Sequence, residues 1–157
     1  MRLKRFMAPK FWPIERKTKK YIISPSPGPH SKECLPTGLI LRDILNYANN
    51  IKEVKEILNK GSVKIDGCIR KDYKFPVGLM DVFSVSDENY RVTLSKYGLV
   101  LLKISKEESN IKLLKIMNKK CVRGKVQLNL HDGRNIFVEK DTYKTGDVLI
   151  FDIDAKK

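Results

Sequence analysis

Three prolines within six residues place the strongest constraint on how this chain can fold. Residues 24–29 read Ser-Pro-Ser-Pro-Gly-Pro. Each proline fixes its own φ, removes a backbone N–H donor and disfavours helical geometry in the residue before it. The segment therefore cannot form a helix or an inner strand, and we expect an extended, semi-rigid strap that sets the N-terminus apart from the rest of the chain.

The N-terminal segment of residues 1–32 is strongly basic. It contains nine Lys or Arg residues and one acidic residue, Glu15, so it carries +8 of the formal net charge of +14. Such an excess favours a polyanionic partner. A solvated, disordered tail is the alternative, but Phe11 and Trp12 are uncommon in tails of that kind. We therefore predict a basic arm, residues 1–35, that becomes ordered on nucleic acid.

Residues 36–86 have the pattern of two helices followed by a hairpin. Apolar residues recur at helical spacing between 41 and 48, and Asn50 can cap a second helix. Farther on, Asp66-Gly67 supplies the positive φ angles of a tight turn between two short strands. This pattern predicts a small αα–β-hairpin domain.

Residues 87–157 vary mostly with the period of β-strands. The polar run 86–89 marks the predicted boundary, and Ser105 with Glu108 can form a capping box for one helical turn. Short strands separated by turns are typical of a small β-barrel-like domain, so the predicted fold class is α+β. The expected strands are residues 91–94, 99–104, 125–130, 135–138 and 148–151.

The sequence contains no recognisable pattern for catalysis or metal binding. It has no P-loop and no dinucleotide-binding glycine motif, and its two histidines, His30 and His131, lie in different segments. Asp66, Asp81 and Asp132 lie near turn glycines, where Asx turns explain them. We therefore expect no enzyme activity, no cofactor and no bound metal.

The spacing of the cysteines and the length of the apolar runs indicate the compartment in which the protein works. Cys34, Cys68 and Cys121 are odd in number and widely spaced, which predicts neither a disulfide framework nor a zinc site. No apolar run approaches the roughly 18 residues of a membrane-spanning helix, and no secretory signal follows the basic N-terminus. We expect a cytoplasmic protein with reduced thiols and no membrane partner.

Cations on the arm, and others on the helices and hairpin, are the candidates for RNA contact. If the helices pack on the hairpin, several of these cations, Lys64 and Arg70 among them, can share a face that meets phosphates. For any single lysine a merely solvated surface is the alternative, and Trp12 could either stack on a base or anchor the arm. The candidate RNA-binding residues are Lys4, Arg5, Lys10, Trp12, Arg16, Lys17, Lys19, Lys20, Arg42, Lys52, Lys55, Lys64, Arg70 and Lys71.

Four blocks in order carry a resemblance to a known family. They are Arg-Phe-Met-Ala-Pro-Lys-Phe-Trp at 5–12, Ser-Pro-Gly-Pro-His at 26–30, Glu-Cys-Leu-Pro at 33–36 and Phe-Pro-Val-Gly-Leu-Met-Asp-Val at 75–82. Together they resemble the archaeal and eukaryotic small-subunit ribosomal protein S4e. The helical and hairpin segments, with Leu-Ile-Leu-Arg-Asp at 39–43 and Gly-Ser-Val-Lys-Ile-Asp-Gly at 61–67, resemble the S4-type RNA-binding domain.

The resemblance implies three parts: a basic extension at 1–35, an RNA-binding domain at 36–86 and a central β domain at 87–157. It implies binding to small-subunit ribosomal RNA beside neighbouring ribosomal proteins, without catalysis and without a small-molecule substrate. Members of the family continue into a C-terminal KOW-type segment, which this sequence lacks.

Individual residues also match the family. Arg5, Lys10 and Trp12 match its basic, aromatic arm, and the positions of Arg42 and Lys64 match its RNA-facing surface.

Two other functions remain as alternatives at this point. An RNA pseudouridine synthase or methyltransferase can use the same small domain to bind RNA, although residues 90–157 are few and show no cofactor loop. A free RNA-binding regulator outside the ribosome is the second alternative, and the sequence separates it poorly from a ribosomal protein.

Overall fold

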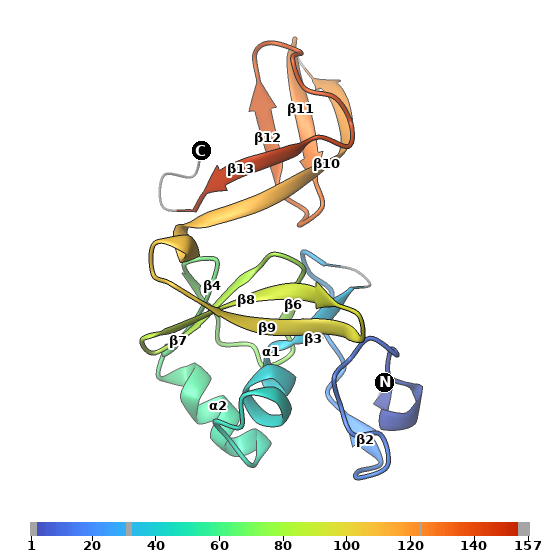
Figure 1. The fold of residues 1–157 in the computed structure, drawn as a ribbon, viewed down its shortest axis with the longest axis vertical. Helices are drawn as coiled ribbons and strands as arrows, with labels where there is room; N and C mark the ends of the chain where they lie inside the picture. The colour runs from blue at the N-terminus through green and yellow to red at the C-terminus, as the bar shows by residue number, and fades with distance from the viewer. Residues whose placement is uncertain (1–2, 31–32, 123, 154–157) are drawn as a thin grey trace.

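The computed structural model describes residues 3–30, 33–122 and 124–153, and they form two lobes (Figure 1). We call residues 3–104 the first lobe and residues 111–153 the second lobe. Each lobe has its own cluster of buried apolar side chains. The described residues are mostly strands with few helices, so the predicted α+β class is confirmed.

The first lobe contains the N-terminal segment, the helices and a five-stranded sheet of order β5-β4-β7-β8-β9. Its elements are β1 (Leu3–Lys4), η1 (Arg5–Met7), β2 (Tyr21–Ile22), β3 (Cys34–Pro36), α1 (Thr37–Leu39), η2 (Ile40–Ile44), α2 (Ile51–Asn59), β4 (Val63–Ile65), β5 (Cys68–Ile69), β6 (Pro76–Gly78), β7 (Val82–Val85), β8 (Glu88–Ser95) and β9 (Gly98–Ile104).

The second lobe is a curled sheet of four strands, in the order β12-β11-β10-β13. A short turn, η3, connects the lobes, and the capping box predicted there is present, since Ser105 and Glu108 each bind the other's backbone N–H. The elements are η3 (Glu108–Asn110), β10 (Ile111–Val122), β11 (Lys125–Leu130), β12 (Asn135–Val138) and β13 (Val148–Asp152).

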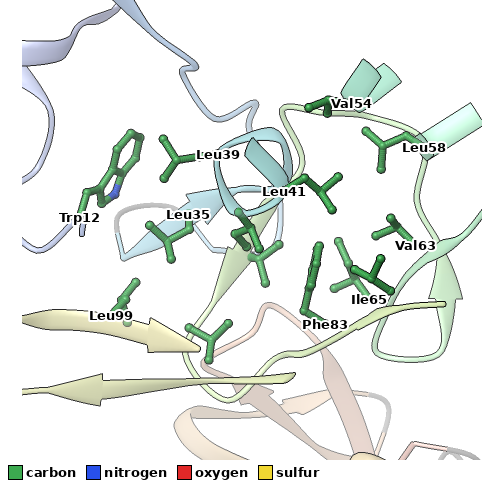
Figure 2. Close-up of a cluster of buried hydrophobic side chains, with 14 of the residues drawn as sticks. Trp12, Leu35, Leu39, Leu41, Val54, Leu58, Val63, Ile65, Phe83 and Leu99 are labelled. Atoms are coloured by element: carbon green, nitrogen blue, oxygen red, sulfur yellow. The ribbon is translucent and has the colours of Figure 1, made fainter. Parts of the chain in front are cut away.

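The N-terminal segment packs against the rest of the first lobe, which corrects the expectation of an arm that needs RNA for order. Strand β1 pairs with β2, and the backbone carbonyl of Phe11 accepts a hydrogen bond from the Leu99 N–H (3.2 Å). Trp12 is 4% exposed, and its indole donates to the Cys34 carbonyl (2.9 Å). Figure 2 shows Trp12 beside Leu39 at one end of the buried cluster.

The first helical segment ends earlier than the sequence pattern predicted. It ends at Ile44, with Leu45 as its C-cap, because Asn46 has a positive φ of 56°. Asn50 does stand at the start of α2, but its own side chain forms no cap there. Instead the carboxylate of Glu53 accepts the Asn49 N–H (2.7 Å). Val54 of α2 turns into the core (Figure 2).

The tight turn between β4 and β5 has the predicted backbone, with φ of 48° at Asp66 and 74° at Gly67. The predicted boundary at residues 86–87, in contrast, falls in the turn between β7 and β8, two strands of one sheet. The residues of the two buried clusters instead separate on either side of η3, since the first cluster ends at Leu101 and the second begins at Leu114. No helix in the described part of the chain is long and apolar enough to span a membrane.

Candidate nucleic-acid interface

Three predicted cations meet around the start of helix α2. A hollow of about 450 Å³ is lined by Lys19 of the N-terminal segment, Arg42 of η2 and Lys52 of α2, together with the residues that begin the helix. The sequence separates these three side chains widely. Packing of the N-terminal segment against the rest of the first lobe brings them together.

The start of α2 adds backbone donors to this hollow. The first N–H groups of a helix have no acceptor within the helix and lie at the positive end of its dipole. Together with lysines, such an end favours phosphate groups. Glu53 is the opposing charge, and the backbone N–H of Asn49 holds the pKa of its carboxyl below the usual value.

Arg42 is held in place by its neighbour. Its guanidinium donates twice to the Asp43 carboxylate, at 3.1 Å from Nε and 2.7 Å from a terminal nitrogen. The Arg42 side chain is only 10% exposed. Because its orientation is fixed before any ligand arrives, little rotamer entropy is lost when its remaining donors bind a phosphate.

A second hollow of about 380 Å³ adjoins the first and shares Arg42 with it. Tyr21, Tyr73 and Lys74 line it. Lys55 and Lys74 lie over the Tyr73 ring, with their ammonium nitrogens 5.2 and 5.7 Å from its centroid. The lysines thus surround an aromatic ring that can offer a face to an unpaired base.

We call these two adjoining hollows and their rim the arm–α2 surface. It combines cations with aromatic rings, the pairing that nucleic-acid-binding proteins use for phosphates and bases. Lys20 joins it because its ammonium lies 5.5 Å from the Tyr21 ring. The surface consists of Lys19, Lys20, Tyr21, Arg42, Lys52, Lys55, Tyr73 and Lys74.

Three members of this surface were missed by the sequence prediction. Tyr21 lies in the predicted arm but was not among its candidate residues, and Tyr73 and Lys74 lie in a segment for which no element was predicted. A signal for them was present, because each tyrosine directly adjoins lysines in the sequence.

Three other predicted residues are used inside the fold, and burial of Trp12 and Arg5 corrects the assignment of these two as RNA contacts. Trp12 is buried, which selects the anchoring alternative over stacking. Arg5 is 4% exposed and donates to the Glu15 carbonyl. Arg16 donates to two backbone carbonyls of the N-terminal segment at 2.8 Å each.

The predicted shared face of Lys64 and Arg70 is wrong. Lys64 lines a hollow with Ser84 and Lys106, on the five-stranded sheet. Arg70 lies over the Phe75 ring at 4.6 Å and lines a cavity between the lobes. The remaining candidates are exposed and lie outside the arm–α2 surface: Lys4, Lys10, Lys17 and Lys71.

Three aspartates that the sequence explained as turn residues converge on one buried lysine. The Lys112 ammonium lies 2.6 Å from Asp66, 2.6 Å from Asp81 and 3.2 Å from Asp132. Burial alone would lower the pKa of Lys112, but the charges of Asp81 and Asp66 outweigh it and raise that pKa. The cluster is saturated by its own cation, and the described residues contain no group of side chains suited to a metal ion.

Two family models match the chain. Residues 86–157 match the model described as Ribosomal family S4e, and residues 1–33 match the RS4NT domain. These limits lie close to the boundaries predicted from the sequence, although one sheet of the structure crosses the second of them.

Curated relatives and a solved structure are similar over most of the chain. "Small ribosomal subunit protein eS4" of Methanocaldococcus jannaschii is 48% identical, over 96% of this chain and 66% of that protein. The protein of the same name from Staphylothermus marinus is 48% identical, over 91% of this chain and 62% of its own length.

The crystal structure of the 30S ribosomal protein S4e from Thermoplasma acidophilum aligns with a TM-score of 0.71 at 36% identity. The alignment covers 81% of this chain and 67% of that one. The chain thus spans roughly two thirds of the length of these relatives.

Proposed function

Because the chain belongs to the S4e family of ribosomal proteins, we propose that it binds and braces ribosomal RNA as a structural component of the small ribosomal subunit. Its further partners are then neighbouring ribosomal proteins, and its place is the small subunit in the cytoplasm. The observation that carries the proposal is the arm–α2 surface, where cations from three separate segments adjoin two tyrosine rings.

The mechanism is electrostatic. Lysines that neutralise phosphates release the counterions condensed on the RNA, and this release drives binding. Arg42, fixed by Asp43, and the first amides of α2 position the RNA backbone without reading the RNA sequence. Tyr73, flanked by Lys55 and Lys74, offers a face on which an unpaired base can stack.

Within this function we assign three parts. Residues 1–35 form the basic extension, residues 36–86 the S4-type RNA-binding domain with its helices and hairpin, and residues 87–157 the central β domain. The arm–α2 surface supports this division in one respect, since it is built where the first part packs on the second. The exposed candidates away from this surface contact RNA on other faces.

A salt series tests the proposal directly. Affinity for fragments of small-subunit ribosomal RNA is measured at several salt concentrations for the parent chain and for a variant with five surface lysines changed to glutamine. The five are Lys19, Lys20, Lys52, Lys55 and Lys74. If each meets one phosphate, the log–log slope falls by about 0.7–0.9 per lysine, or about four in total.

The matched control changes five exposed lysines of the second lobe in the same way, so the net charge is identical. These are Lys115, Lys120, Lys125, Lys140 and Lys144. Equal slopes for the two variants would show that charge alone matters and would reject the arm–α2 surface as the interface.

Sedimentation separates a ribosomal component from a free RNA-binding regulator. A structural component stays with small subunits through a high-salt wash. Full release of the chain, or a modified nucleotide produced by the chain alone, would contradict the proposal.

A further inference from the structure

The two lobes meet at a buried ion cluster rather than at an apolar interface. Lys112, on strand β10 of the second lobe, is 1% exposed. Two of its three carboxylate partners, Asp66 and Asp81, belong to the first lobe, and each lies 2.6 Å from the ammonium. The third, Asp132, belongs to the second lobe and lies 3.2 Å away.

We propose that Lys112 is a clamp that fixes the orientation of the second lobe on the first. An isolated ammonium would be strongly disfavoured in this buried position. Each carboxylate from the first lobe compensates for that cost only when the lobes are docked in one arrangement. The need to pair the buried charge therefore selects one docked arrangement. An apolar interface would not impose a single arrangement, because apolar surfaces can slide over each other.

The carboxylates of the cluster have all the other partners they need. Asp81 accepts the Gly78 N–H (2.9 Å) and contacts Nε2 of His30. Asp66 accepts the Val82 N–H (3.0 Å), so both first-lobe carboxylates are held by their own backbone before the lysine arrives. A buried polar network of this kind defines its geometry best when every member is satisfied.

Arg134 adds a second bond across the junction. From the second lobe it donates to Asp66 at 2.6 Å, and within its own lobe it lies 3.0 Å from Asp132. Its guanidinium also lies over the Phe151 ring, 5.3 Å from the centroid. Two cations of the second lobe therefore meet the same aspartate of the first, and the relative rotation of the lobes is restricted along with their separation.

The proline strap is part of the same junction. A Cβ on Gly133 would come within 3.2 Å of the Pro29 carbonyl, so the second lobe lies closely on the strap. The ring of His30 occupies the space where a side chain on Gly78 would be, with ring atoms 2.2 Å from that position. Nε2 of His131 lies 3.3 Å from the Leu79 carbonyl. The contacts of Gly133 with Pro29 and of His131 with Leu79 cross the junction and require the docked arrangement.

A clamp between the lobes affects how the protein binds RNA. The arm–α2 surface lies on the first lobe, whereas many exposed lysines lie on the second. With the lobes fixed, the cations of the second lobe keep one position relative to the arm–α2 surface. This consequence rests on the proposed function, but the clamp itself does not, and it is tested without RNA.

A nitroxide label reports the docking of the lobes directly. Cys68 is exposed in the first lobe and lines the interlobe cavity together with Gly133 and Arg134. Labelling is restricted to Cys68 by changing the exposed Cys121 to serine, while burial raises the pKa of the Cys34 thiol and protects it. In the parent chain we expect strong broadening of the amide signals of Gly133 and Arg134.

Lys112→Met keeps the length of the side chain and removes its charge. The clamp predicts that the Gly133 and Arg134 signals recover in this variant, while signals of β5 beside the label remain broadened. The control is Lys115→Met on the same strand, because Lys115 is exposed and has no carboxylate partner among the described residues. Unchanged broadening at Gly133 in Lys112→Met would overturn the proposal.

A second pair of variants keeps the test valid if Lys112→Met does not fold. Asp66→Asn removes a carboxylate across the junction, and asparagine tolerates the positive φ of that turn as aspartate does. Asp132→Asn removes one within the second lobe. A clamp predicts that Asp66→Asn releases the Gly133 signal more than Asp132→Asn does. Equal release would mean that the cluster merely stabilises the fold, and it would reject the clamp.

Discussion

Truncating Trp12 tests whether the basic N-terminal segment is part of the fold. Its indole is 4% exposed and packs in the core of the first lobe with Leu35, Leu39 and Leu99 (Figure 2). Replacing a fully buried tryptophan by alanine costs about 3–5 kcal/mol. Loss of the hydrogen bond to the Cys34 carbonyl adds about 1 kcal/mol. The expected loss for Trp12→Ala is therefore about 5 kcal/mol, a large part of the roughly 5–15 kcal/mol that stabilises a typical domain.

Urea unfolding followed by far-ultraviolet circular dichroism measures this loss, because Trp12 is the only tryptophan in the sequence and its fluorescence disappears with it. Trp12→Phe keeps most of the apolar volume and isolates the hydrogen bond. Phe6→Ala is the control, since Phe6 is an aromatic residue of the same segment that is 77% exposed, and surface changes stay within about 0.5 kcal/mol. A loss below about 1 kcal/mol for Trp12→Ala, similar to the control, would refute packing of this segment into the core.

Three other perturbations have defined outcomes. Gly67→Val should destabilise the chain by about 1–3 kcal/mol in urea unfolding, because Gly67 has a φ of 74° that a β-branched residue resists, whereas Gly67→Asn should be tolerated. Burial alone would raise the pKa of Asp81, but the His30 hydrogen bond and the Lys112 charge outweigh it and lower that pKa. The resulting stability is present above the ordinary carboxyl pKa of about 3.9 and is lost as the pH falls through the lowered value, so melting curves from neutral to acid pH should fall more steeply for the parent than for Asp81→Asn. Thiol titration after unfolding should find Cys34, Cys68 and Cys121 all reduced, and metal analysis should find no zinc; fewer than three thiols or stoichiometric zinc would contradict this.

Local features of the fold were predictable where they depend on neighbouring residues. The turn at Asp66-Gly67 and the capping box of Ser105 with Glu108 follow from residue type and spacing alone. Strand β10 was not predicted, because a lysine at 112 faces inward while Lys115 faces outward, which breaks the alternation of apolar and polar residues. That inward lysine becomes intelligible only when partners from distant turns are known.

In the candidate site, too, individual residues were predictable but their arrangement was not. Sequence reasoning found Lys19, Arg42 and Lys52 one by one, since each is a cation in a basic context. It could not place them together, because their proximity depends on where the N-terminal segment packs. For the same reason it assigned Lys64 and Arg70 to one face, although the strands carry them to different hollows.

The packing of the N-terminal segment on residues far along the chain affects the order of folding. Residues of the N-terminal segment are held by residues that the ribosome makes much later: Phe11 by Leu99, and His30 by Asp81. Contacts between such distant parts of a chain form slowly, since a long loop must close before they contribute. The strap can therefore pack in its final position only after strands β6 to β9 have been synthesised. Until then the most basic stretch of the nascent chain lacks these long-range contacts, so premature binding to nucleic acid competes with its own folding.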